Sequence, residues 1–162
     1  MPLDLIKTVL EGPFQINPRP EPVPGDLRRG WGIAVLILIL GRSYNKRASL
    51  QKLHFMAYYI RSQHNRAVVQ EVLLSENKSL NVVVRIEPWL NNALAFAHGS
   101  GLIKIEKGKA ARLTIKGTLV LVEITRDELV FSNEIAFLNA VSKLATEDTI
   151  NRIMKPKLDL WH

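Results

Sequence analysis

The sequence contains no cysteine, and this absence excludes several kinds of chemistry. A chain without cysteine forms no disulfide, offers no thiolate nucleophile and builds no zinc site with sulfur ligands. It suits a reducing compartment, so we expect a cytoplasmic protein. The N-terminal stretch "MPLDLIKTVLEG" lacks the basic start and long apolar centre of a secretion signal, in agreement with that expectation.

Long apolar runs are also scarce. The most hydrophobic stretch, "WGIAVLILIL" at residues 31–40, is half the length of the roughly 20 apolar residues that a membrane-spanning helix needs. We therefore expect a buried central helix and no membrane partner. The chain of 162 residues is 47% apolar, which is enough for one domain with a real core.

Groups that carry out catalysis or bind metals are few and scattered. His54 lies in an apolar segment and is expected to be a core or edge residue, and His64 and His98 lie near helix ends without a carboxylate pair. No glycine loop has the phosphate-binding spacing, and no serine stands in a nucleophile elbow. The sequence predicts no catalytic residue, no metal site and no cofactor, and therefore a protein that is not an enzyme.

Acidic residues are missing where basic ones gather. The net charge is +7; residues 31–70 carry six Lys or Arg and no Asp or Glu, and residues 100–117 carry five against the single Glu106. Residues 118–162 carry five basic and seven acidic groups. Two separate basic segments favour a polyanionic partner such as nucleic acid. The alternative is that these residues serve only solubility.

Proline and apolar periodicity outline the predicted elements. Five of the eight prolines fall in residues 12–26, which indicates an extended arm. The pattern then predicts helices at 27–42 and, capped by Ser49, from residue 50, a turn at 63–66, an ambiguous segment at 67–74 and a short strand at 81–86. A third helix at 87–101, a hairpin over 102–115, a helix capped by Thr114, and helices on both sides of Thr146 complete the chain.

This order is typical of a winged helix. The fold class is therefore mainly α, or α+β: a winged helix-turn-helix with a two-stranded basic wing and additional C-terminal helices. We expect a proline-rich N-terminal segment at residues 1–25, the winged-helix domain at 26–125, and C-terminal helices and a tail at 126–162. A fold of this kind serves many functions, so the function has to come from its surface.

The predicted wing carries the cations that a phosphate backbone attracts, while the third helix carries none between Ile86 and Gly101. The expected nucleic-acid-binding residues are Lys104, Lys107, Lys109, Arg112 and Lys116 on or beside the wing, with Lys46 and Arg47. In a DNA-reading winged helix, the third helix supplies base contacts. Without cations, this helix is poorly suited to that task, although Asn91 and Asn92 could bond adenine.

The third helix is predicted to bind protein. Helical spacing buries residues 90, 93, 94 and 97 and leaves Trp89, Asn92 and Phe96 on the opposite face. Exposed aromatic side chains mark protein interfaces. Trp161, in the terminal "LDLWH", is a further candidate partner-binding residue. The alternatives are that the rings pack under the wing or the C-terminal helices, and that the tail folds back on its own domain.

Four stretches carry a narrower resemblance: "RRGWGIAVLILIL", "RASLQKLHFMAYYI", "VRIEPWLNNALAFAHGSGLIKIEKGKAARLTIKG" and "NEIAFLNAVSKLATEDTINRI", across residues 28–153. Together they resemble the winged-helix middle component of bacterial ABC-three-component defence operons, the group that includes Lamassu systems. The shared features are an "R-x-D-P-x-L-x-x-A-L" helix start, a "GLI" strand, an "LT-x-KG" turn and a late "E-x-x-F-L" helix. Glu87 replaces the aspartate, while Glu134, Phe137 and Leu138 match the late helix.

The resemblance implies a non-catalytic subunit of an anti-phage complex that senses DNA. Its partners would be an SMC-like ABC ATPase and an effector subunit, and its contact with the DNA backbone would be non-specific. A possible homodimer belongs to the alternative hypothesis, a free-standing winged-helix transcriptional regulator. That regulator would use the wing and the asparagines on an operator and dimerise through the helices after Thr114.

Overall fold

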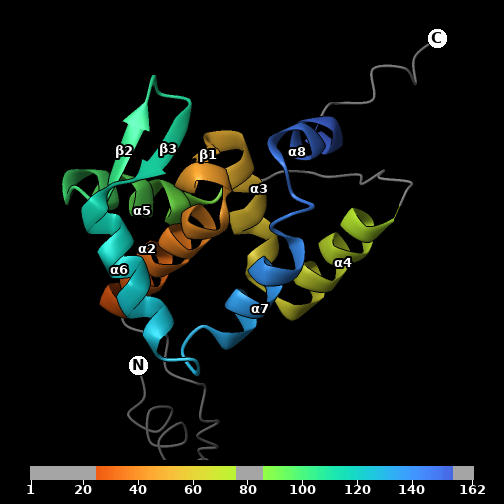
Figure 1. Cartoon of the computed structure of the whole chain (residues 1–162), viewed down its shortest axis with the longest axis horizontal. Helices are drawn as coiled ribbons and strands as arrows, with labels where there is room; N and C mark the ends of the chain where they lie inside the picture. The colour runs from red at the N-terminus through yellow and green to blue at the C-terminus, as the bar shows by residue number, and fades with distance from the viewer. Residues whose placement is uncertain (1–24, 76–85, 155–162) are drawn as a thin grey trace, which may run out of the picture.

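The chain folds around one central helix. The structure is a computed structural model, and it describes residues 25–75 and 86–154. Helix α2 (Gly25–Arg42) runs through the middle of the fold, and residues 35–40 have at most 1% of their surface exposed (Figure 1). A helix that is apolar all round must be covered on every side. Among the described helices, none combines the length and hydropathy needed to cross a lipid bilayer.

A short strand that the sequence pattern does not predict follows α2. A 3-10 turn (Tyr44–Lys46) leads into β1 (Arg47–Ser49), and α3 (Leu50–Ile60) begins directly after it. The Ser49 hydroxyl accepts a hydrogen bond of 3.0 Å from the backbone N–H of Lys52, so the predicted cap of α3 is confirmed. Three residues are too few for an alternating pattern, and β1 exists only because another strand pairs with it.

Helix α4 (Gln63–Leu74) corrects the prediction of a turn at 63–66. The Ser62 hydroxyl accepts a hydrogen bond of 3.1 Å from the backbone N–H of Asn65, and this cap starts a helix there. The ambiguous segment 67–74 continues the helix and buries Val69 and Leu73. The strand predicted at 81–86 lies outside the described residues except for Ile86, which is in no strand.

Three strands form one small antiparallel sheet, so the predicted two-stranded sheet gains a strand. Strands β2 (Ile103–Glu106) and β3 (Ala110–Leu113) make the predicted hairpin, and β1 pairs with the free edge of β3. The register aligns Ala48, Ala111 and Ile105 across the sheet, on the face that packs against the core. The described chain is thus mainly helical with a three-stranded sheet, which fits an α+β fold.

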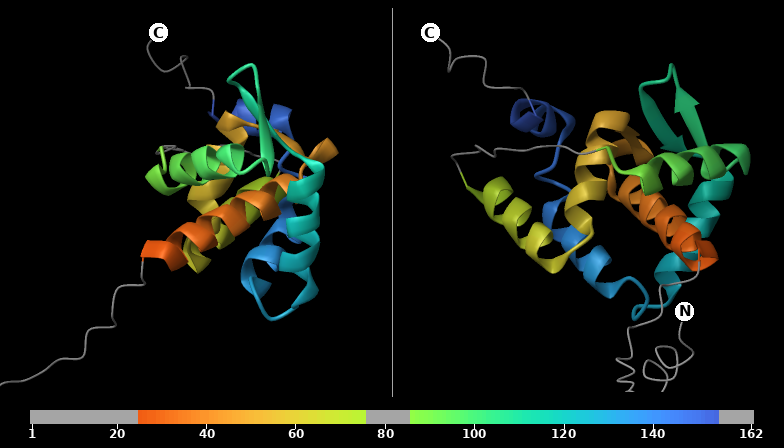
Figure 2. Two further views of the ribbon diagram at one scale, coloured as in Figure 1. Left: turned by 90° about the vertical axis from the view of Figure 1, so that its left-hand side faces the viewer. Right: turned by 180° about the vertical axis from the view of Figure 1, so that it is seen from behind.

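Helix α5 (Pro88–Gly99) packs across α2 and leads into the hairpin (Figure 2, right). Proline is favoured in the first turn of a helix because its nitrogen has no hydrogen to leave unpaired. The side of α5 that faces the core consists of the residues that helical spacing predicts, namely Leu90, Ala93, Leu94 and Ala97.

Helix α6 (Ile115–Arg126) is held close to the core by two glycines. The Thr114 hydroxyl accepts a hydrogen bond of 3.1 Å from the backbone N–H of Gly117, which confirms the predicted cap. A side chain at Gly117 would collide with the carbonyl oxygen of Leu102. A Cβ at Gly41 of α2 would lie 2.5 Å from a methyl carbon of Leu121. Both glycines therefore permit a close approach of α6.

Two helices on either side of Thr146 complete the described chain, as predicted. Helix α7 (Ser132–Val141) packs against α2 and α4, and α8 (Glu147–Met154) packs against α3. The Glu147 carboxylate accepts hydrogen bonds from the backbone N–H of Ser49, at 2.9 Å, and from its hydroxyl, at 2.7 Å. Burial lowers the pKa of the nearby Lys52, and the charge of Glu147 opposes that shift.

A buried carboxylate fixes the start of α5. The side chain of Glu87 is 6% exposed, and its Oε2 accepts a hydrogen bond of 2.8 Å from a guanidinium nitrogen of Arg61, just after α3. Its backbone carbonyl accepts hydrogen bonds from the N–H groups of Leu90 and Asn91. The side chain of Glu87 therefore points into the protein and ties the start of α5 to the end of α3.

We expect Arg61→Ala to lower the free energy of unfolding by about 1–3 kcal/mol, because the Glu87 carboxylate would stay buried without its partner. Chemical denaturation measures this change. Arg126→Ala is the matched control, because its pair with Glu123 joins side chains that are 71% and 62% exposed. We expect a loss of no more than about 1 kcal/mol there. Equal losses in the two variants would contradict the structural role of the Glu87 pair.

Candidate interface on the hairpin and helix α5

The hairpin turn presents two lysines at its tip. Lys107 and Gly108 both have positive φ angles, 50° and 64°, and the backbone N–H of Lys109 donates a hydrogen bond of 3.0 Å to the carbonyl of Glu106. Two successive residues with positive φ form the tight turn whose twist matches that of the strands. The hairpin extends beyond the helices in both views of Figure 2, and Lys107 and Lys109 in its turn are exposed.

A row of cations crosses the outer face of the sheet. The register places Arg47 of β1 opposite Arg112 of β3, and Arg112 opposite Lys104 of β2. Because side chains alternate between the two faces of a strand, these three lie on the face opposite Ala48 and Ala111. The structure thus brings together cations that are up to 65 residues apart in the sequence.

One carboxylate neutralises part of this row. Glu106 accepts a hydrogen bond of 2.6 Å from Nε of Arg47 through one oxygen and a bond of 2.7 Å from Nε of Arg112 through the other. Hydrogen bonds from Arg47 and then Arg112 lower the pKa of Glu106, because they stabilise its ionised form. This arrangement, here called the Glu106 clamp, leaves one net positive charge among the three side chains.

Two further cations of the predicted set make hydrogen bonds to other residues of the same chain. Nζ of Lys46 lies 3.4 Å from the Thr118 hydroxyl, and Nζ of Lys116 donates a hydrogen bond of 2.9 Å to the carbonyl of Ser100 at the end of α5. A cation at that position interacts favourably with the helix C-terminus. Among the described residues, the predicted wing cations that make no side-chain hydrogen bond or ion pair are Lys104, Lys107 and Lys109.

Trp89 corrects the prediction of an outward aromatic pair. Its ring is half-buried, packs edge to face on Trp31 with centroids 5.0 Å apart, and lies against Gly32 of α2. Helical spacing places Trp89 opposite the core side of α5, but the N-terminal part of α2 covers that position. Phe96 is 57% exposed and Asn92 is exposed, so these two side chains do face outward. Trp161 lies outside the described residues.

A groove of about 570 Å³ runs between the start of α2 and the outer side of α5. Its lining combines rings, an amide and two guanidinium groups: Arg28, Arg29, Ile33, Trp89, Asn92, Ala93, Ala95 and Phe96. Sequence reasoning missed Arg28 and Arg29, because their place beside Phe96 depends on how α2 and α5 cross. The structure thus supplies from α2 the cations that α5 lacks.

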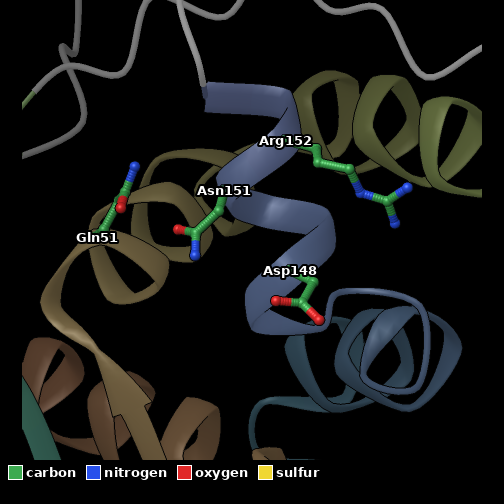
Figure 3. Close-up of a pocket in the computed structure, with 4 residues that line it drawn as sticks. All are labelled: Gln51, Asp148, Asn151 and Arg152. Atoms are coloured by element: carbon green, nitrogen blue, oxygen red, sulfur yellow. The ribbon is translucent and has the colours of Figure 1, made fainter.

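Among the described residues, no group of three or more metal-ligating side chains could hold a metal ion. Nδ1 of His54 is buried without a hydrogen-bond partner in the described chain, and burial lowers the pKa of this histidine against an opposing effect of Glu87. The polar hollow between α3 and α8 is lined by Gln51, Asp148, Asn151 and Arg152, and Arg152 points away from Gln51 and Asn151 (Figure 3).

Comparisons of the chain with protein-family models, curated proteins and solved structures find no match. The candidate interface therefore rests on its geometry alone.

The Glu106 clamp makes a direct prediction for the titration of its carboxyl group. We expect NMR detection of the side-chain carboxyl carbon to give Glu106 a pKa below the ordinary value of 4.5, and Arg47→Ala or Arg112→Ala to raise it. A depressed pKa means that the clamp stabilises the fold above pH 4.5 and loses this contribution as pH falls through the folded-state pKa. An unchanged pKa in both variants would show that the two ion pairs do not form.

Proposed function

We propose that this chain is a cytoplasmic, non-catalytic winged-helix subunit of a DNA-sensing anti-phage complex. In this proposal it docks on an SMC-like ABC ATPase through the groove between α2 and α5 and helps to engage an effector subunit. It touches the DNA backbone weakly, and without sequence preference, through the hairpin.

The order of elements supports the winged-helix assignment. Helix α2, strand β1 and helix α3 are followed by α5 and then by the β2–β3 hairpin, and the strand order is β1-β3-β2. In a winged helix, the third helix packs over the first two and the hairpin after it forms the wing. Here α4 stands between α3 and the third helix as an additional element.

The observation that carries the proposal is the contrast between the hairpin and α5. Lys104, Lys107 and Lys109 stand free on the hairpin, whereas α5 itself has no lysine or arginine and exposes Phe96 beside a groove. Exposed aromatic rings and arginines are the residue types enriched at protein interfaces. Free lysines on a protruding turn suit phosphate contact, which is independent of sequence.

Phe96→Asp should weaken co-purification with the SMC-like ATPase encoded by a neighbouring gene at least tenfold, because a charge would enter an apolar contact. Leu74→Asp is the matched control, since Leu74 is 66% exposed on α4, away from the groove. We expect this control to co-purify fully. If both variants co-purify equally well with the ATPase, the groove is not the docking surface. The absence of such an ATPase gene would contradict the proposal as a whole.

Charge changes on the hairpin test the DNA contact. Lys107→Glu with Lys109→Glu should weaken binding to duplex DNA at low salt more than tenfold. The slope of log K against the logarithm of the salt concentration should become shallower by about two. Glu106→Gln should strengthen binding, because it releases Arg47 and Arg112 from the clamp. Both effects can be measured by fluorescence anisotropy at several salt concentrations.

A double variant with the same charge change, Lys143→Glu with Arg152→Glu, is the control, because both side chains are exposed away from the hairpin. Unchanged binding in the hairpin variant would exclude the wing from DNA contact. Tight binding of one duplex sequence at physiological salt would instead favour the alternative function, a dimeric transcriptional regulator. The exposed asparagines of α5 and an apolar surface on α6 favour that alternative.

A further inference from the structure

Helix α6 is apolar on two sides and is covered on only one. Gly117, Val120, Leu121 and Ile124 face the core. On the opposite side, Ile115, Leu119 and Val122 are 86%, 63% and 51% exposed. These three residues follow one another at intervals of four and three, so they form a single stripe along the helix. Figure 1 places α6 at an edge of the fold, with α2 on its inner side.

Arg126 continues the stripe four residues after Val122 and pairs with Glu123, and the charged residues on the flank of the stripe have a definite order. Lys116 and Glu123 are seven residues apart, so they lie on the same flank of the stripe, separated by about 10 Å along the helix axis. The other flank carries Thr118 and Thr125. One flank therefore changes from positive to negative along the helix, while the other carries hydroxyl groups, with the Lys46 ammonium group beside Thr118.

The charges on α6 can pair with the charges on a second copy of α6 only when the two helices run antiparallel. When two copies of a helix pair antiparallel about a two-fold axis, each flank faces the same flank of the other copy with its direction reversed. Lys116 of each copy then lies opposite Glu123 of the other, and the two Leu119 side chains meet near the axis. In a parallel pair, the charged flank would face threonines.

We propose that the exposed stripe of α6 is the contact surface of an antiparallel homodimer, centred on Leu119 and flanked by two Lys116–Glu123 ion pairs between the copies. The existing bonds leave room for these pairs. Lys116 gives one of its three donors to the Ser100 carbonyl, and Glu123 uses Oε1 for Arg126. The dimer surface shares no residue with the groove, so the loss of one surface in a variant would not remove the other.

Sedimentation and light scattering of the full chain should report a dimer, with twice the monomer mass of 18.3 kDa. Leu119→Asp should convert it to a folded monomer, and circular dichroism checks the fold. Leu74→Asp, on the surface of α4, should leave the dimer intact. A monomeric wild-type chain would overturn the proposal, and a dimer unaffected by Leu119→Asp would exclude α6 as its interface.

Charge exchange tests the antiparallel arrangement. Lys116→Glu and Glu123→Lys, each alone, should raise the dimer Kd about tenfold, because each turns two attractions into two repulsions. Mixing the two variants should restore assembly as a heterodimer, in which every opposing pair is again of opposite sign. Glu71→Lys, an exposed charge change on α4, is the control and should have no effect. Failure of the mixture to assemble better than either variant would exclude the antiparallel arrangement.

Discussion

The fold depends on the complete burial of α2. Six consecutive side chains of this helix are removed from water, which requires neighbours on all sides, and α3, α5, α6, α7 and the sheet supply them. Each of these elements packs one face against α2, and this packing determines which of its residues face outward. The groove forms beside the N-terminal part of α2, and α6 is held against the helix where Gly41 allows Leu121 to approach. The positions of both candidate protein-binding surfaces, the groove and the exposed stripe of α6, therefore depend on how the other elements pack against α2.

Patterns with a local cause could be predicted from the sequence. The apolar run of α2, the caps at Ser49 and Thr114, the tight turn at Gly108 and the core side of α5 all follow from neighbouring residues. Strand β1 could not be predicted, because its hydrogen-bonding partner lies more than 60 residues away. The first turn of α4 could not be predicted because asparagine favours turns, and histidine and asparagine are weak helix formers.

The candidate site shows the same division between local and distant causes. The cations of the hairpin are visible in the sequence, but their partners are not. The sharing of Glu106 between Arg47 and Arg112 depends on the pairing of β1 with β3. Likewise, the periodicity of α5 correctly separates its core side from Phe96, whereas the covering of Trp89 depends on the angle at which α2 passes over it. Sequence patterns therefore identify which residues are available, and the crossing of elements decides which remain exposed.

The ion pair between Arg61 and Glu87 has a consequence for engineering the chain. Because Arg61 directly follows α3, its contact with Glu87 ties the start of α5 to the end of α3, across 26 residues of sequence. A redesign of this contact should therefore change both residues together, because a change at Arg61 alone leaves the buried carboxylate of Glu87 without its partner.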